Sequence, residues 1–94
     1  MFLSLDYELP GGTPQTYSIN ASEVKAVTLF LADKEEGATR DHVYIDYRIG
    51  GPLRISVEAG RGAALYREIV RMLSAAIREQ TTQHLSFTAF PGSR

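Results

Sequence analysis

Apolar and polar residues alternate over several short stretches of the chain, which is the pattern of strands buried on one side. The first stretch runs from Phe2 to Leu9, and a second runs from Gln15 to Ile19 beyond a turn rich in glycine and proline. We therefore expect a hairpin. The residues from Asn20 to Glu23 then predict a single helical turn with Asn20 as its cap.

A third strand and a polar loop are expected in the middle of the chain. Residues Val24 to Ala32 form an apolar run in which β-branched and aromatic side chains favour a strand over a helix. The charged segment from Asp33 to Asp41 follows, with the sequence DKEEGATRD. Its polarity predicts an exposed loop that is the most mobile part of the chain.

The sequence HVYIDYRIGGPLRISVE predicts a second hairpin. Its apolar residues, Ile49 among them, share one face, and the other face carries polar side chains and a tyrosine: Tyr44, Asp46, Arg48, Arg54, Ser56 and Glu58. Matching the faces of the two strands requires an odd number of loop residues. We expect the three-residue loop Gly50-Gly51-Pro52, which places Tyr47 opposite Ile55 and Arg48 opposite Arg54.

The clearest helical pattern runs from Ala63 to Gln80. Apolar side chains recur there every three or four residues and form one wide stripe: Leu65, Tyr66, Ile69, Val70, Leu73, Ala76 and Ile77. The opposite side of the predicted helix carries a stripe of cations: Arg67, Arg71 and Arg78.

A short last strand is expected from His84 to Phe90, where the residues alternate again. Phe87 points inward with Leu85, which leaves Phe90 on the other face and exposed. The stretch has no proline or lysine to protect an open strand edge. It therefore predicts either a strand paired in its own sheet or an edge open to another chain, which would form a homodimer or bind a different partner.

Together these elements predict one α+β domain over residues 1–94, a length that suits a single core. We expect a mostly antiparallel sheet or partly open barrel of five to six strands. One long C-terminal amphipathic helix covers it, and a short final strand follows. The predicted core packs helix residues onto the second hairpin: Leu65, Ile69 and Leu73 against Ile45, Tyr47, Ile55 and Val57.

Three segments resemble those of bacterial pleckstrin-homology-like domains: YSINASEVKAVTLF, HVYIDYRIGGPLRISV and AALYREIVRML. The resemblance extends from Tyr17 to Ile77 and implies a binding scaffold, which favours recognition over catalysis. Lipid-binding members of the wider family carry basic residues around the first hairpin loop, whereas PGGTPQ here has none. The strand after the helix is a second departure, either an appended edge strand or a sign of a different β-rich sandwich or roll.

Few residues here are suited to catalysis or metal binding. The chain has no cysteine and two histidines, which have no metal-binding spacing. Asp41 cannot orient His42, because neighbouring strand residues point to opposite faces. The segment Gly60-Arg61-Gly62 predicts a strand-to-helix connection, since a phosphate-binding loop would be longer and end in lysine. We expect no catalytic, cofactor or metal site and no small-molecule substrate.

Charge is distributed unevenly along the chain. Residues 1–47 carry three basic and eight acidic side chains, whereas residues 48–94 carry seven arginines and three glutamates. Either the two halves pair across the fold, or a basic face is exposed to an acidic partner. The net charge of −1 and the lack of aromatic residues between the arginines disfavour direct binding of nucleic acid.

These features predict a small non-enzymatic binding module that acts through protein–protein contacts. Its candidate surfaces are the outer hairpin face, the arginine stripe of the helix and the terminal strand: Tyr44, Asp46, Arg48, Arg54; Arg67, Arg71, Arg78; and Phe90. The alternative is a small inhibitor or regulator, for example one encoded by a phage, that docks on a larger nucleic-acid-handling complex. It would use Asp33, Glu35 and Glu36 to occupy a basic site.

A cytoplasmic location is expected, because no apolar run is long enough to span a bilayer and the N-terminus lacks the basic residues of a signal peptide. Membrane attachment without a spanning segment needs a basic patch or an inserted apolar group. We therefore predict no binding to liposomes that contain acidic phosphoinositides at physiological salt. Co-sedimentation of the protein with such liposomes would contradict this prediction.

Overall fold

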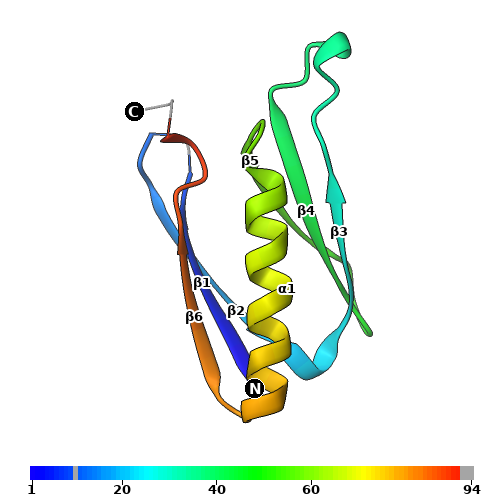
Figure 1. The fold of residues 1–94 in the computed structure, drawn as a ribbon, viewed down its shortest axis with the longest axis vertical. Helices are drawn as coiled ribbons and strands as arrows, with labels where there is room; N and C mark the ends of the chain where they lie inside the picture. The colour runs from blue at the N-terminus through cyan, green and yellow to red at the C-terminus, as the bar shows by residue number, and fades with distance from the viewer. Residues whose placement is uncertain (10, 92–94) are drawn as a thin grey trace.

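The structure, a computed structural model, describes residues 1–9 and 11–91 (Figure 1). Within these residues it is an α+β fold of six strands, one α-helix and two 3₁₀ turns. In chain order the elements are β1 (Phe2–Glu8), β2 (Pro14–Asn20), η1 (Ala21–Glu23), β3 (Val24–Phe30), η2 (Lys34–Glu36), β4 (Arg40–Tyr47), β5 (Leu53–Glu58), α1 (Gly62–Glu79) and β6 (Thr82–Phe87).

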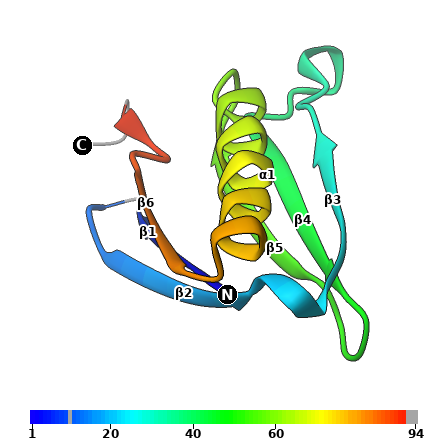
Figure 2. The same cartoon turned by 60° about the horizontal axis from the view of Figure 1, so that its bottom comes forward.

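The strands form two sheets of three strands each within the described residues, where a single sheet or a partly open barrel was expected. The first sheet has the order β2-β1-β6, and the second has the order β3-β4-β5. All neighbours are antiparallel except β1 and β6, which are parallel. Helix α1 lies in the opening between the two sheets, and η1 leads the chain from one sheet to the other (Figure 2).

One hydrophobic core fills the space between the helix and both sheets. The predicted contact between α1 and the second hairpin is confirmed, because Leu65, Ile69 and Leu73 belong to one buried cluster with residues of β4 and β5: Val43, Ile45, Ile55 and Val57. Tyr47 is partly buried against this cluster, and burial raises the pKa of its hydroxyl. The core covers only part of the apolar stripe, since Val70 and Ile77 remain 38% and 49% exposed.

The second hairpin has a longer loop than expected. Tyr44 is opposite Arg54 and Ile45 is opposite Leu53, so the predicted pairs of Tyr47 with Ile55 and of Arg48 with Arg54 are wrong. The end of β4 pairs with β3 alone, and the Arg48 N–H donates a hydrogen bond to the carbonyl of Glu23. These contacts hold the chain away from β5, and Ile49 in the loop is 87% exposed. The observed register differs from the predicted one by an even number of residues. Each strand residue therefore still lies on the face, inner or outer, that was expected.

The last strand begins and ends earlier than expected. It spans Thr82–Phe87 and pairs with β1 in its own sheet, with Leu85 opposite Leu5. The chain then leaves the sheet, so alternation no longer decides which way Phe90 points. Phe90 is only 8% exposed, and the Arg40 guanidinium lies 5.1 Å from the centre of its ring. The expectation that Phe90 is exposed is therefore wrong.

The segment predicted as a mobile loop contains a buried anchor. Its middle forms η2, but Asp41 belongs to β4 and is 2% exposed. The Asp41 Oδ1 atom accepts a hydrogen bond from the N–H of Ala32 at 2.8 Å. Its Oδ2 atom accepts from the N–H groups of Gly60 and Gly62 at 3.0 and 2.9 Å. The carboxylate thus joins the end of β3, the turn after β5 and the first residue of α1.

The environment of Asp41 favours its charged form. Burial by itself would raise the pKa of the Asp41 carboxyl, but the three N–H donors and the neighbouring His42 outweigh this effect and lower it. Gly62 allows this close approach, since a Cβ atom there would lie 2.5 Å from the Cβ of Asp41. The glycine at the start of the helix is therefore required by packing against the anchor.

Substitution of Ile69 tests the packing of the helix onto the sheets. Ile69→Ala should lower the free energy of unfolding by roughly 2–5 kcal/mol, because it removes buried surface and leaves a cavity. Its neighbour Val70 is partly exposed, so Val70→Ala serves as the control and should cost less than about 1 kcal/mol. Chemical denaturation measures both changes. Equal effects of the two substitutions would contradict the arrangement.

Substitution of Asp41 tests the anchor. Asp41→Asn should lower the free energy of unfolding at pH 7 by roughly 1.5–3 kcal/mol, because an amide cannot accept all three hydrogen bonds. Because folding lowers the pKa of Asp41, its contribution is complete above about pH 4, the pKa of a free aspartate, and is lost as the pH falls through the folded-state value.

The difference in stability between the wild type and Asp41→Asn should therefore be constant near neutral pH and shrink in acid. Denaturation curves recorded across the acid range measure it. Asp33→Asn is the matched control, because Asp33 is exposed and accepts one local hydrogen bond, from the N–H of Glu35. A difference that stays unchanged down to pH 2, well below about pH 4, would show that the Asp41 charge contributes nothing.

Candidate functional site

The outer face of the β3-β4-β5 sheet carries a connected group of aromatic and polar side chains. We call it the aromatic face and define it by five residues: Phe30, His42, Tyr44, Arg54 and Ser56. Strand pairing brings them together, with His42 between Phe30 and Ser56 across the sheet, and with Tyr44 opposite Arg54. The alternate residues of the same strands point inward to the core, where α1 packs.

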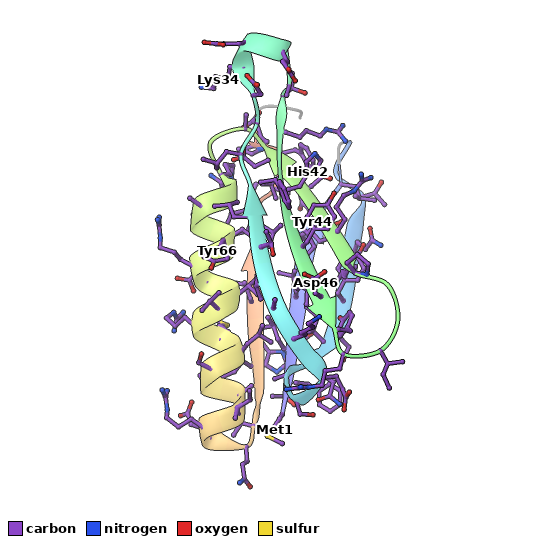
Figure 3. The ribbon with its side chains drawn as sticks, turned by 90° about the vertical axis from the view of Figure 1, so that its right-hand side faces the viewer. Met1, Lys34, His42, Tyr44, Asp46 and Tyr66 are labelled. Carbon is purple, nitrogen blue, oxygen red and sulfur yellow. The ribbon has the colours of Figure 1, made fainter. Side chains whose placement is uncertain are left out.

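The rings of the aromatic face are in contact with one another. Phe30 and Tyr44 meet edge to face, with ring centres 5.2 Å apart, and the ring centres of His42 and Tyr44 lie 6.4 Å apart. Phe30 is 55% exposed, so much of this apolar surface meets solvent. Figure 3 shows His42, Tyr44 and Asp46 following one another along β4, with Tyr66 of α1 on the far side of β3.

A hydrogen bond joins His42 to β5. Its Nδ1 atom lies 2.8 Å from the Ser56 hydroxyl oxygen, which is the spacing of a nucleophile and its base. Such a pair also needs a group that orients the imidazole. As predicted, Asp41 lies on the opposite face, where its oxygens accept three backbone N–H groups. The bond therefore ties β4 to β5 and holds the imidazole in position beside Tyr44.

The structure brings together only part of the predicted outer face. Tyr44 and Arg54 are direct neighbours, whereas Asp46 lies opposite Ala26 of β3. Arg48 has left the sheet, and its Nε atom donates a hydrogen bond to the Ser22 carbonyl at 3.4 Å. Arg48 therefore belongs to the contact between the hairpin loop and η1.

The arginine stripe of the helix is separate from the aromatic face, because α1 packs on the inner side of the sheet. Arg71 and Arg78 lie 2.5 Å and 3.8 Å from the carboxylates of Glu68 and Glu79 on the same helix. These exposed pairs contribute little to stability. Phe90 lies in the core, so the terminal strand does not present it to a partner.

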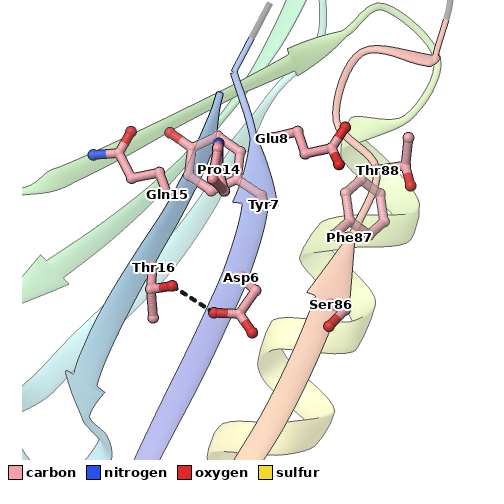
Figure 4. Close-up of a pocket in the computed structure, with 9 residues that line it drawn as sticks. All are labelled: Asp6, Tyr7, Glu8, Pro14, Gln15, Thr16, Ser86, Phe87 and Thr88. Carbon is pink, nitrogen blue, oxygen red and sulfur yellow. Dashed lines mark hydrogen bonds between the residues drawn. The ribbon is translucent and has the colours of Figure 1, made fainter. Parts of the chain in front are cut away.

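A hollow of about 430 Å³ lies beside the ends of β1, β2 and β6 (Figure 4). Polar and apolar groups share its wall, and the Asp6 carboxylate accepts a hydrogen bond from the Thr16 hydroxyl at 2.6 Å. Arg61 lies 4.8 Å from the centre of the Phe87 ring and donates to the Thr88 carbonyl. The hollow presents hydroxyls and carboxylates, and the contacts of Asp6 with Thr16 and of Arg61 with Phe87 and Thr88 join neighbouring segments of the chain.

Phe30 and His42 belong to the aromatic face, although neither is among the binding residues predicted from the sequence. The signal was present in the alternation of β3. Val27 and Leu29 point inward, so Phe30 must point outward, next to Tyr44 on the neighbouring strand. The pairing of β3 with β4 was the missing information, since it decides which residue of each strand becomes a neighbour.

Comparison with models of known protein families, with curated proteins and with solved structures finds no match for this chain. The geometry of the molecule therefore carries the functional argument. Within residues 1–9 and 11–91, no helix is long and apolar enough to cross a membrane. In the same part of the chain, no three side chains of histidine, aspartate or glutamate are grouped as metal ligands.

Proposed function

We propose that this domain is a protein-binding module and that the aromatic face is its contact surface. The observation that carries the proposal is the edge-to-face contact of the exposed Phe30 with the partly buried Tyr44, with Arg54 beside Tyr44. Tyrosine, phenylalanine and arginine are enriched at protein interfaces, and tyrosine and arginine often carry much of the binding energy. The alternative role of such a cluster is to stabilise the pairing of β3 with β4. That role does not require half of the Phe30 side chain to be exposed.

The setting of the aromatic face suits binding. A packed core stands behind β4 and β5, and the bond from His42 to Ser56 fixes one edge of the cluster. Rings held in place before binding lose little conformational entropy when a partner arrives. The pleckstrin-homology-like resemblance agrees with a recognition role, although it rests on the sequence pattern alone.

A second candidate is the small regulator that occupies a basic site through Asp33, Glu35 and Glu36. The observation that favours it is the position of η2, which projects beyond the ends of β3 and β4 (Figure 1). Asp33 caps this turn by accepting the Glu35 N–H, and the side chains of the turn are exposed. Direct binding of nucleic acid is less well supported, because Arg54 is the one cation of the aromatic face and phosphate contacts need several.

Affinity capture from the native host tests the proposed function. Full-length protein and the variants Tyr44→Ser and Phe30→Ser serve as baits, and Ile49→Ser is the control because Ile49 is exposed outside the aromatic face. For a captured partner, each face variant should weaken binding by about 30-fold or more, the loss expected of a central interface residue. The control should bind like the wild type.

The same experiment separates the two candidates. If the partner is lost with Glu35→Lys and Glu36→Lys but kept with Tyr44→Ser and Phe30→Ser, the acidic turn is the contact and the aromatic face is not. Folding of every variant is checked by circular dichroism. Retention of the partner by both face variants rejects the proposed function.

A further inference from the structure

A second surface lies on the other side of β3, where a groove of about 260 Å³ separates this strand from α1. We call it the α1–β3 groove. Val24 and Val27 line it from β3, and Tyr66, Val70 and Ile77 line it from α1. Val70 and Ile77 are the exposed part of the helical stripe that the core leaves uncovered.

The strand that borders the groove has a free edge. Within the described strands, β3 pairs with β4 and has no neighbour on its other side. Lys25 and an irregular register between Val24 and Ala26 protect the first half of this edge. The second half, Val27–Phe30, contains neither charge nor proline. Such an edge can accept another strand, and a partner's strand would lie about 4.8 Å away, over the groove.

The rim of the groove is basic. Lys25 is the charged side chain among the lining residues. Three of the four apolar residues that α1 contributes to the groove wall are followed directly by an arginine: Tyr66-Arg67, Val70-Arg71 and Ile77-Arg78. Arg71 and Arg78 contact glutamates of the helix, but Arg67 has no ion pair within the described residues. The nearest acid along β3 is Glu23 of η1, which is exposed.

This charge distribution decides between two kinds of occupant. A second copy of the chain, paired edge to edge about a two-fold axis, would place the same basic rim against itself. Like charges brought together in this way oppose association. A segment that carries aspartate or glutamate would instead meet Lys25 and Arg67 with opposite charge.

We propose that the α1–β3 groove binds an extended, acidic and apolar segment of another protein, which adds as a strand to the free edge of β3. Alternate apolar side chains of the segment enter the groove between Val27 and Val70. Its carboxylates lie near Lys25 and Arg67. This surface is distinct from the aromatic face, so the inference goes beyond the proposed function.

The test uses a phage-displayed library of random nine-residue peptides, selected against the full chain. Enriched peptides should alternate apolar residues and carry more aspartate and glutamate than the starting library. Val70→Asp should weaken their binding about tenfold or more, because it places a charge in the apolar wall. Ala64→Asp is the matched control, since Ala64 is exposed on the same helix and does not line the groove. Ile77→Asp replaces Val70→Asp if that variant does not fold.

Nuclear magnetic resonance locates the bound peptide. Amide shifts should change along Val27–Phe30, and Tyr44→Ser should leave the peptide affinity unchanged. This last result separates the groove from the aromatic face, so either proposal can fail without the other.

Three outcomes overturn the inference. The first is a selection that yields no binder, or yields basic or uncharged peptides. The second is a peptide whose binding Val70→Asp leaves unchanged. The third is a concentration-dependent dimer, seen by light scattering and lost in Val70→Asp, which would make a second copy the occupant. A dimer that Val70→Asp leaves intact would point instead to the predicted self-association through β6.

Discussion

The buried carboxylate of Asp41 is the constraint on which the arrangement of the second sheet depends. A charged group taken out of water is strongly destabilising unless hydrogen bonds replace its hydration. Here the N–H groups of Ala32, Gly60 and Gly62 do so. They belong to three different parts of the chain, so one side chain sets the end of β3, the turn after β5 and the start of α1 relative to one another.

This anchor also determines which side chains face solvent. Neighbouring strand residues point to opposite faces, so His42, next to the inward-pointing Asp41, points outward, and so does Tyr44 two residues further along β4. His42 and Tyr44 therefore both lie on the outer face, next to Phe30 of β3. A contact made inside the molecule for stability thus presents the aromatic cluster outside it.

Strand β3 separates the two surfaces for which we propose partners. Its outward residues contribute Phe30 to the aromatic face, and its inward residues contribute Val24 and Val27 to the α1–β3 groove. Helix α1 packs on the inner side of the β3-β4-β5 sheet, so it leaves the outer, aromatic face uncovered, and it covers only part of the inner side of β3. The helix buries Leu65, Ile69 and Leu73 in the core. The adjoining part of its apolar stripe, with Val70 and Ile77, is exposed to solvent.

Local patterns in the sequence predicted the helix, the six strands and the inward or outward side of most strand residues. These properties depend on residues that are near in the chain, such as the regular spacing of Leu65, Ile69 and Leu73. Tertiary contacts decided the rest: the division into two sheets, the parallel pairing of β6 with β1, the long loop after Tyr47 and the burial of Asp41 and Phe90. From its polarity alone, Asp41 was predicted to lie in an exposed loop. Its three hydrogen-bond donors are 9, 19 and 21 residues away in the chain, so no local pattern indicates that the carboxylate is buried.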